Sequence, residues 1–357
     1  MLFSGVKASE QPCSWGFGSF SPVMTIDRHR FSREIIDGVR SLYALDNRHG
    51  VLAVLQNFLI IAATIVLAEY GGWVLYLPAI LVIGSRQRAL ATLTHEAAHG
   101  TLARNKILND ILGTIFSGYA VAILLRPYKN SHVRDHHGSF GDPEADCDFR
   151  YMIEQGVYGQ SRGWRYIWHV IVSPALLLKV PAYLVYLARD RFAFGNDKND
   201  HQEVALFAVF WLAILVSSIA AGMFDLLVWY WFIPFFTAYQ IIGWYIELAE
   251  HAPLMEQGKD IHMSRNRNSH WIERLFTGMH GESFHLAHHL FPRVPFWRIS
   301  ELNQLLRRDA SYRASDDACG GIFWSSNDAP ALVVQLVRDN VAALRSSSAS
   351  EPVREED

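Results

Sequence analysis

Cysteine is scarce in this chain of 357 residues, and the three that occur lie far apart. Cys13, Cys147 and Cys319 form no CxxC pair and no even set that could build a disulfide framework. This pattern fits a reducing compartment and argues against an iron–sulfur cluster or a zinc site held by thiolates. Thiolate chemistry is therefore not expected here.

A strong excess of charge of one sign is also lacking. The chain has 32 Lys and Arg against 35 Asp and Glu, and no basic domain or stripe stands out, so no nucleic-acid partner is predicted. The opening sequence MLFSGVKASEQPCSW has no apolar core, so we expect no cleaved signal peptide. Hydrophobic residues, by contrast, make up 50% of the chain, enough to bury a large core in protein or in lipid.

Two pairs of long apolar stretches predict membrane-spanning helices. Residues 51–69 and 73–92 flank a Tyr-Gly-Gly turn, and residues 204–224 and 226–248 flank a second short break. Each stretch approaches the roughly 20 apolar residues that a spanning helix needs. The sequence therefore predicts an all-α integral membrane protein with about four transmembrane helices in two hairpins.

Two further apolar stretches, residues 111–125 and 170–187, are less regular. Prolines, a lysine and a histidine interrupt the second stretch, and proline breaks the hydrogen bonding of a helix interior. We expect an interfacial or re-entrant helix there, with an additional span as the alternative.

The distribution of basic residues predicts the orientation in the membrane. The hairpin turns near residues 70–73 and 222–226 contain no Lys or Arg, whereas the opposite side carries many, from Arg28 to Arg134. Under the positive-inside rule that side is cytoplasmic, and the histidine clusters lie on it. We expect a protein of the bacterial inner membrane with a cytoplasmic, histidine-rich cap that holds two metal ions.

The chain divides into three predicted regions. Residues 1–50 form a cytoplasmic N-terminal segment, and residues 51–344 form the membrane domain. Residues 345–357, RSSSASEPVREED, are polar and charged, which predicts a disordered tail.

Histidine is abundant, and eight of the 16 lie in three short motifs. In THEAAHG two histidines are four residues apart, which places them on one face of a helix. SHVRDHH and FHLAHH each end in a doublet, and neighbours on a helix point about 100° apart, so the members of a doublet can serve different metals. Eight imidazoles are too many for one ion. The motifs contain His95, His99, His132, His136, His137, His285, His288 and His289.

A ninth histidine stands alone after the fourth apolar stretch. Glu247 lies one helical turn before His251, and an ionisable residue at a membrane exit is costly without a partner. We predict that His251 is a further metal ligand with a carboxylate beside it. The alternative is a histidine that only caps the helix end at the interface.

Carboxylates inside or next to the motifs are predicted to hydrogen-bond ligand imidazoles. Glu96, Asp135 and Glu282 are the candidates, together with Glu247. The acidic turn at residues 142–148 is interpreted instead as a solvated loop, with hydrogen bonds to ligand imidazoles as the alternative.

Two other kinds of metal protein are weighed against these motifs. His95 to His99 matches the HExxH pattern of zinc proteases, but such an enzyme needs one metal and a third ligand, not two further clusters. A metal sensor or transporter would need a polar path through the membrane spans. The predicted spans contain few polar or charged residues, chiefly Gln56, Gln240 and Glu247.

The order HxxxH, HxxxHH and HxxHH resembles the integral-membrane fatty acid desaturase and hydroxylase superfamily, over about residues 51–295. The resemblance implies two iron ions that activate O2 and remove hydrogen from an unactivated C–H bond. It implies a desaturase-like domain at residues 51–344. The iron ligands that it implies are His95, His99, His132, His136, His137, His251, His285, His288 and His289.

Two departures from relatives in that family bear on the site and on the electron supply. Acyl-CoA desaturases carry an asparagine one turn before the isolated histidine, where this chain has Glu247. The chain also has no HPGG haem-binding motif, so a separate electron donor such as a ferredoxin or a cytochrome is expected. The other expected partner of the chain is membrane lipid.

The substrate is left open by the residues. The resemblance implies a C=C bond introduced into an acyl chain or a lipid-like substrate. THEAAHGTLARNKILND and GDPEADCDF also resemble a bacterial branch, the dihydrorhizobitoxine desaturase branch, that acts on small amino-acid-derived molecules. A hydroxylase with the same di-iron centre is a further alternative.

Overall fold

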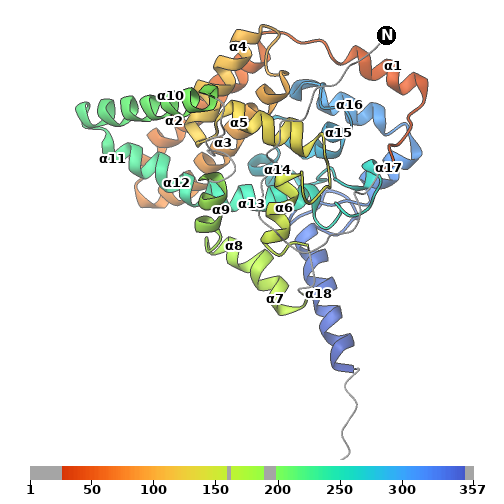
Figure 1. The fold of residues 1–357 in the computed structure, drawn as a ribbon. Coiled ribbons are helices and arrows are strands. Elements are labelled where there is room, and N and C mark those ends of the chain that lie inside the picture. Colours follow the sequence, from red (N-terminus) through yellow and green to blue (C-terminus); the bar gives the residue numbers. More distant parts are fainter. Residues whose placement is uncertain (1–25, 159–161, 189–197, 350–357) are drawn as a thin grey trace, which may run out of the picture.

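The computed structural model describes residues 26–158, 162–188 and 198–349. Within these residues every regular element is a helix, and two isolated bridges, Asp27 with Lys259 and Ser269 with Ser325, are the only extended pairings. The prediction of an all-α chain is therefore confirmed (Figure 1).

The first two predicted spans are helices that follow each other with a single-residue break. α2 (His49–Gly71) and α3 (Trp73–His99) are joined at Gly72, whose φ of 59° is a conformation that favours glycine. α3 continues beyond the predicted apolar stretch and carries the first histidine motif in its last turns.

The second pair of predicted spans is also helical but less regular. α10 (Lys198–Ala220) is followed by a turn at Gly222 with φ 65°. The next helix contains an aromatic π-helical turn, in which each backbone hydrogen bond joins residues five apart instead of four and the helix is locally wider. This helix consists of α11 (Phe224–Leu227), a π-helical turn at Val228–Phe232, α12 (Ile233–Phe236) and α13 (Ala238–His251).

Three helices of the described chain are long and apolar enough to cross a membrane, namely His49–Gly71, Asp200–Ala220 and Phe224–His251. α3 is long, but Arg86 and Arg88 interrupt its apolar sequence. Two bent helix pairs raise the number of candidate spans to as many as five. The protein therefore has the helices of a membrane protein.

The bent pairs coincide with the two irregular apolar stretches. The first, from Lys106 to His136, bends by 99°, and the second, from Trp164 to Tyr186, bends by 84°. Both geometries fit a re-entrant loop or a broken span. The pairs contain α4 (Lys106–Ile111), α5 (Leu125–Lys129), α7 (Trp164–Tyr166), α8 (Ser173–Ala175) and α9 (Val180–Tyr186).

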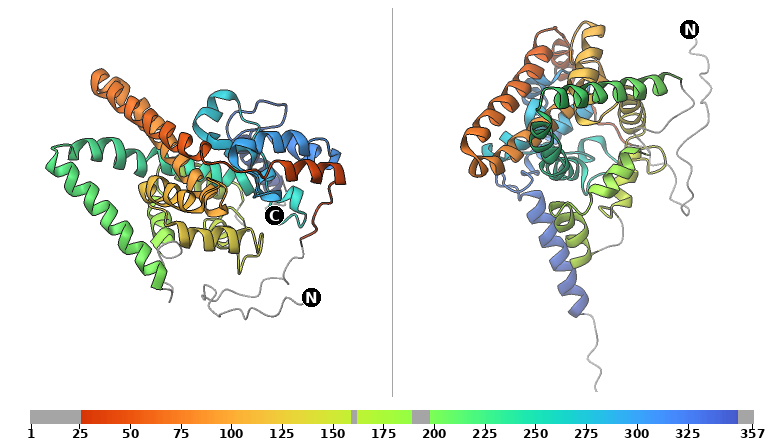
Figure 2. Two further views of the ribbon diagram at one scale, coloured as in Figure 1. Left: turned by 90° about the horizontal axis from the view of Figure 1, so that it is seen from above. Right: turned by 90° about the vertical axis from the view of Figure 1, so that its left-hand side faces the viewer.

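Shorter helices lie on the opposite side of the molecule from the α2–α3 and α10–α11 pairs (Figures 1 and 2). Ile35 and Val39 pack against Leu302 and Leu306 in a separate small core. The helices of this side are α1 (Arg33–Ser41), α15 (His285–Leu290), α16 (Ile299–Leu306) and α17 (Ala310–Asp317). Two further short helices, α6 (Cys147–Glu154) and α14 (Trp271–Thr277), lie nearer the centre of Figure 1.

The last helix projects away from the rest of the molecule (Figure 1). α18 (Leu332–Ala349) continues past residue 345, where the sequence predicts that a disordered tail begins. Residues 350–357 of that predicted tail lie outside the described residues.

Close contact between α3 and α13 brings together the two long helices that carry His95, His99 and His251. Gly84 of α3 lies directly against the backbone of α13, where a Cβ atom would come within 2.7 Å of the Tyr239 nitrogen. Tyr76 of α3 also donates a hydrogen bond to the carbonyl of Trp229, 2.9 Å away. The absence of a side chain at Gly84 is therefore a condition for this packing.

Replacing Gly84 by alanine is expected to separate α3 from α13 and to lower stability by about 1–3 kcal/mol, the usual cost of overpacking. Thermal unfolding of the detergent-solubilised protein, followed by tryptophan fluorescence, measures the effect. Gly243→Ala on α13 is the matched control, because its Cβ would meet nothing closer than Arg88 Nη1 at 3.9 Å. Equal melting temperatures for the two variants would contradict the close-packing argument.

Candidate metal centre

The end of α3 supplies the first pair of imidazoles. His95 and His99 lie one helical turn apart, and their ring centroids are 4.8 Å apart. α3 ends immediately after them at Gly100, whose φ of 74° suits a helix C-terminus. The predicted placement of both histidines on one helical face is confirmed.

The second motif forms a π-helical turn rather than the α-helix expected from its spacing. The turn covers Asn130–His136, and the His137 nitrogen donates to the His132 carbonyl 2.9 Å away. The doublet points to two sides: the His137 ring lies 4.7 Å from that of His99, and the His136 ring lies 5.0 Å from that of His251.

The third motif lies on α15, which ends before Phe291 and Pro292, because proline cannot continue a helix. Its doublet divides in the same way. The His288 ring is 4.4 Å from that of His95, whereas the His289 ring is 4.9 Å from that of His251. Each doublet therefore contributes one imidazole to each of two neighbouring groups.

The first imidazole group has five members whose ligand nitrogens lie within 4.8 Å of one another. All five Nε2 atoms are buried, and none has a hydrogen-bond partner in the described part of the chain. Buried polar atoms without partners are costly, and converging imidazole nitrogens are typical metal ligands. This group fits one metal ion. Its members are His95, His99, His132, His137 and His288.

The second imidazole group consists of His136, His251 and His289, joined by His285. His285 Nε2 lies 3.0 Å from His251 Nε2, and His136 Nε2 lies 3.4 Å from His289 Nε2. Two imidazole nitrogens bound to one zinc ion at a right angle would lie about 3 Å apart, since each bond is about 2.0–2.1 Å. The spacing in this group therefore fits nitrogens that share an ion.

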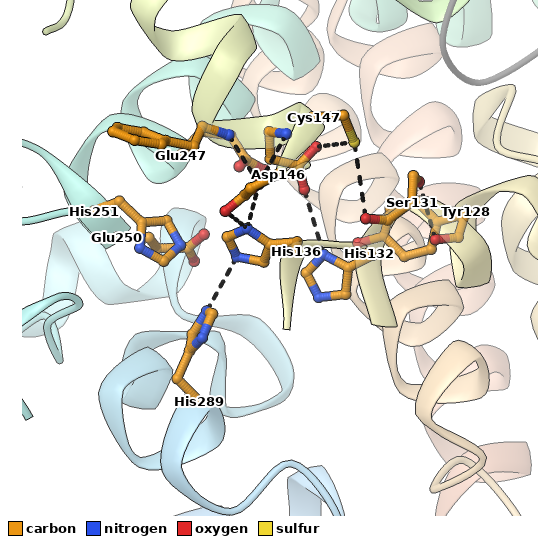
Figure 3. A network of polar contacts seen from close by, with 12 residues as sticks. Tyr128, Ser131, His132, His136, Asp146, Cys147, Glu247, Glu250, His251 and His289 are labelled. Carbon is orange, nitrogen blue, oxygen red and sulfur yellow. Dashed lines mark hydrogen bonds and ion pairs between the residues drawn. The ribbon is translucent and has the colours of Figure 1, made fainter. Parts of the chain in front are cut away.

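Three carboxylates face the far side of these rings. Both oxygens of Asp146 lie 2.9 Å from His136 Nδ1, as Figure 3 shows. Glu250 lies 3.5 Å from His285 Nδ1, and Asp148 lies 3.5 Å from His132 Nδ1. A carboxylate at Nδ1 keeps the ring proton on that nitrogen, so the Nε2 lone pair points into the imidazole group.

Asp146 and Asp148 belong to the acidic turn that the sequence offers as imidazole partners only as an alternative, and Glu250 is not among the predicted partners. The interpretation of residues 142–148 as a solvated loop is wrong for Asp146, which is completely buried. Asp146 also begins α6 by accepting hydrogen bonds from the Asp148 and Phe149 nitrogens. An acidic residue before a short amphipathic helix is a usable capping signal, but no sequence feature points from Asp146 to His136 or from Glu250 to His285.

Asp135 does not lie where the sequence prediction puts it. Its carboxylate pairs with Arg134 at 2.7 Å and is partly exposed, and none of its contacts in the described residues is with an imidazole. The π-helical turn accounts for the difference, because it directs His136 and His137 inward and leaves Asp135 on the outer surface.

The other predicted carboxylates are near the imidazoles but engage other partners. Glu96 accepts a hydrogen bond from the Thr101 hydroxyl at 2.7 Å and from the Phe296 nitrogen at 3.1 Å. Glu247 and Glu282 both pair with Arg88, at 3.0 and 2.7 Å. They form part of a wall beside the imidazoles rather than hydrogen bonds to them.

Burial also determines the protonation state of the three histidine side chains on α15. It lowers the pKa of His285, His288 and His289 well below the ordinary histidine value, and the surrounding imidazoles lower it further. The three rings are therefore neutral at pH 7. A neutral imidazole has the free lone pair that metal binding requires.

A cavity of about 160 Å³ leads to both groups. Apolar walls from Ile123, Phe149 and Met152 surround it, and it reaches the rings of His95 and His251. Charged side chains also line it: Arg88, Glu96, Asp148, Lys179, Glu247, Glu250 and Glu282.

Known proteins resemble this chain over most of its length. A model of the fatty acid desaturase family matches residues 71–316. The dihydrorhizobitoxine desaturase of Bradyrhizobium elkanii is 34% identical over 318 residues, which cover 87% of this chain and 90% of that protein.

More distant similarity extends to enzymes with other named activities. The sn-1 acyl-lipid omega-3 desaturase (ferredoxin) of Synechocystis sp. is 22% identical over 287 residues, 75% of this chain and 78% of that protein. The zeaxanthin 4-ketolase of Chlamydomonas reinhardtii is 25% identical over 285 residues, 72% of this chain and 54% of that protein. The chain therefore belongs to the fatty acid desaturase family and is an oxidoreductase.

Proposed function

We propose that this chain is an O2-dependent desaturase that holds two iron ions, one in each imidazole group. The observation that carries the proposal is the convergence of five buried, unpartnered Nε2 atoms in the first group beside a second group with 3.0 and 3.4 Å nitrogen contacts. The proposed ligands are His95, His99, His132, His137 and His288 for one ion, and His136, His251, His285 and His289 for the other.

Two iron ions held in this way supply O2 activation and the removal of hydrogen from an unactivated C–H bond. The protein supplies orientation and a dry environment. Asp146 holds the ring proton at Nδ1 of His136, and Glu250 faces Nδ1 of His285 at 3.5 Å. The apolar cavity walls exclude water from a chain lying against the imidazoles.

A zinc protease is disfavoured by the contacts of Glu96. A protease of the HExxH type uses this glutamate as the general base beside a single metal. Here the Glu96 carboxylate accepts hydrogen bonds from Thr101 and Phe296, and the imidazoles around it belong to two groups.

The substrate class has two candidates, and each has a relative that supports it. An acyl chain is supported by the name of the Synechocystis relative. A small amino-acid-derived molecule is supported by the dihydrorhizobitoxine desaturase, which covers more of the chain at higher identity.

Hydroxylation is a second candidate reaction, supported by the similarity to a 4-ketolase. Turnover under isotopically labelled O2 separates the two reactions. Label in the organic product would support hydroxylation, and an unlabelled product with a new C=C bond would support desaturation.

The membrane arrangement completes the proposal. α2, α3, α10 and the helix Phe224–His251 would form two hairpins of the domain at residues 51–344, with both imidazole groups on the cytoplasmic side of the inner membrane. Electrons would come from a separate ferredoxin or cytochrome, which is supported by the ferredoxin in the name of the Synechocystis relative.

Replacing one histidine of either group by alanine is expected to abolish the desaturated product. His136→Ala and His288→Ala should each lose at least one of the two proposed ions, because each removes a nitrogen that no neighbouring side chain replaces. Iron per chain is measured by mass spectrometry on protein purified from membranes, and membrane insertion should be retained. His262→Ala is the control, because His262 bonds Ser315 away from both groups. Full activity with undiminished iron in both ligand variants would remove the assignment.

Asp146→Asn is expected to weaken iron binding by roughly 10–100-fold, the usual effect of removing a carboxylate behind a ligand histidine. Asparagine still caps a helix well, so α6 should be retained, and circular dichroism checks this. Asp135→Asn is the matched control, since Asp135 pairs with Arg134 outside the site. Iron affinity that falls equally in both variants, or in neither, would contradict the role given to Asp146.

A further inference from the structure

One face of α13 forms a polar strip along the cavity. Gln240, Trp244, Glu247 and His251 follow at intervals of four, three and four residues, which places them on one helical face, and all four line the cavity. With a rise of 1.5 Å per residue, the Glu247 and His251 positions are about 6 Å apart along the helix. A charged group therefore lies within one helical turn of the second imidazole group.

Glu247 carries charge that its partner does not fully neutralise. Arg88 Nη2 lies 3.0 Å from Glu247 and 2.7 Å from Glu282, and Arg267 lies 3.8 Å from Glu282 and 3.5 Å from Glu250. Two guanidinium groups are therefore shared by three carboxylates. The Glu282 side chain is only 7% exposed, whereas that of Glu247 is 48% exposed. The remaining negative charge is therefore accessible at Glu247.

Lys179 brings a positive charge to the same cavity. It lies between α8 and α9, and its Nζ donates to the side-chain and main-chain oxygens of Gln155, at 3.0 and 3.4 Å. Both partners are neutral, and no carboxylate of the described residues lies within ion-pair distance of Nζ. The ammonium is 6.0 Å from the centre of the Trp244 ring, next to the polar strip of α13.

A buried amide donor completes the polar end of the cavity. Gln240 is 9% exposed, and its Nε2 has no hydrogen-bond partner among the described residues. It lies one turn from Trp244, the residue beside Lys179. An unsatisfied donor at such a position is costly unless a ligand accepts from it.

We infer that the cavity binds a short aliphatic substrate that carries both an ammonium and a carboxylate group, and this inference rests on the proposed function. The ammonium pairs with Glu247, and the carboxylate pairs with Lys179 and accepts from Gln240. The aliphatic part lies between the apolar walls and reaches the imidazoles. An acyl chain without these charges would bury Lys179 and Glu247 without new partners, which is unfavourable.

Calorimetric binding to the iron-loaded, detergent-purified protein tests this inference. The probe is 2-aminohexanoate, and hexanoate and hexylamine each keep only one of its charges. We expect 2-aminohexanoate to bind at least about tenfold more tightly than either, a difference of about 1.4 kcal/mol, because each analogue loses one of the two charge-assisted contacts. Lys179→Met and Glu247→Gln should each weaken its binding by a similar factor.

Matched variants separate recognition of the substrate from damage to the fold. Lys179→Arg and Glu247→Asp keep the charges and should retain most of the affinity. Lys106→Met and Glu144→Gln remove exposed charges that do not line the cavity and should change nothing. Loss of affinity in the neutral variants, with retention in the charge-keeping ones, supports the inference.

Two results would overturn it. One is equal binding of hexanoate, hexylamine and 2-aminohexanoate; the other is unchanged affinity in both neutral variants. Iron content is measured on the same samples, so a protein that holds no iron contradicts the proposed function instead. A protein that holds iron and desaturates palmitoyl lipid, but does not bind 2-aminohexanoate, contradicts only the inference.

Discussion

The packing of nine imidazoles in one buried volume is the constraint on which the rest of the architecture depends. Their lone pairs converge, and no side chain of the described residues satisfies the five Nε2 atoms of the first group. A cation removes this conflict, because it accepts several lone pairs at once. The helices are interrupted accordingly: α3 ends just after His99, the chain forms a π-helical turn before His137, and α13 ends at His251.

Charges around the imidazoles are arranged in successive layers. Carboxylates lie behind the rings, as at Asp146 and Glu250, and a cation lies behind Glu250, where Arg267 Nη1 is 3.5 Å away. Such an order keeps negative charge next to the proposed ions without leaving it unpaired when buried. The cavity wall repeats the order, because Arg88 lies between Glu247 and Glu282.

Much of this arrangement could be predicted from the sequence, because it depends on local periodicity. The spacing of His95 and His99 predicts a shared helical face, and the adjacent histidines predict imidazoles that point in different directions; both geometries are present. The contacts of Asp146 and Glu250 could not be predicted, since they join residues from separate elements. Asp135 illustrates the limit: its proximity in sequence is misleading, because a π-helical turn rotates neighbouring residues differently from an α-helix.

The two doublets have a consequence for how the centre is filled. His136 and His137 share one short backbone segment, as do His288 and His289, yet each pair serves both groups. An ion held by the first group immobilises the backbone on which two ligands of the second group are mounted. A second ion would then meet ligands whose conformational entropy has already been lost, so loading of the two proposed ions would be cooperative. A population of chains short of iron should therefore contain empty and doubly filled molecules rather than singly filled ones.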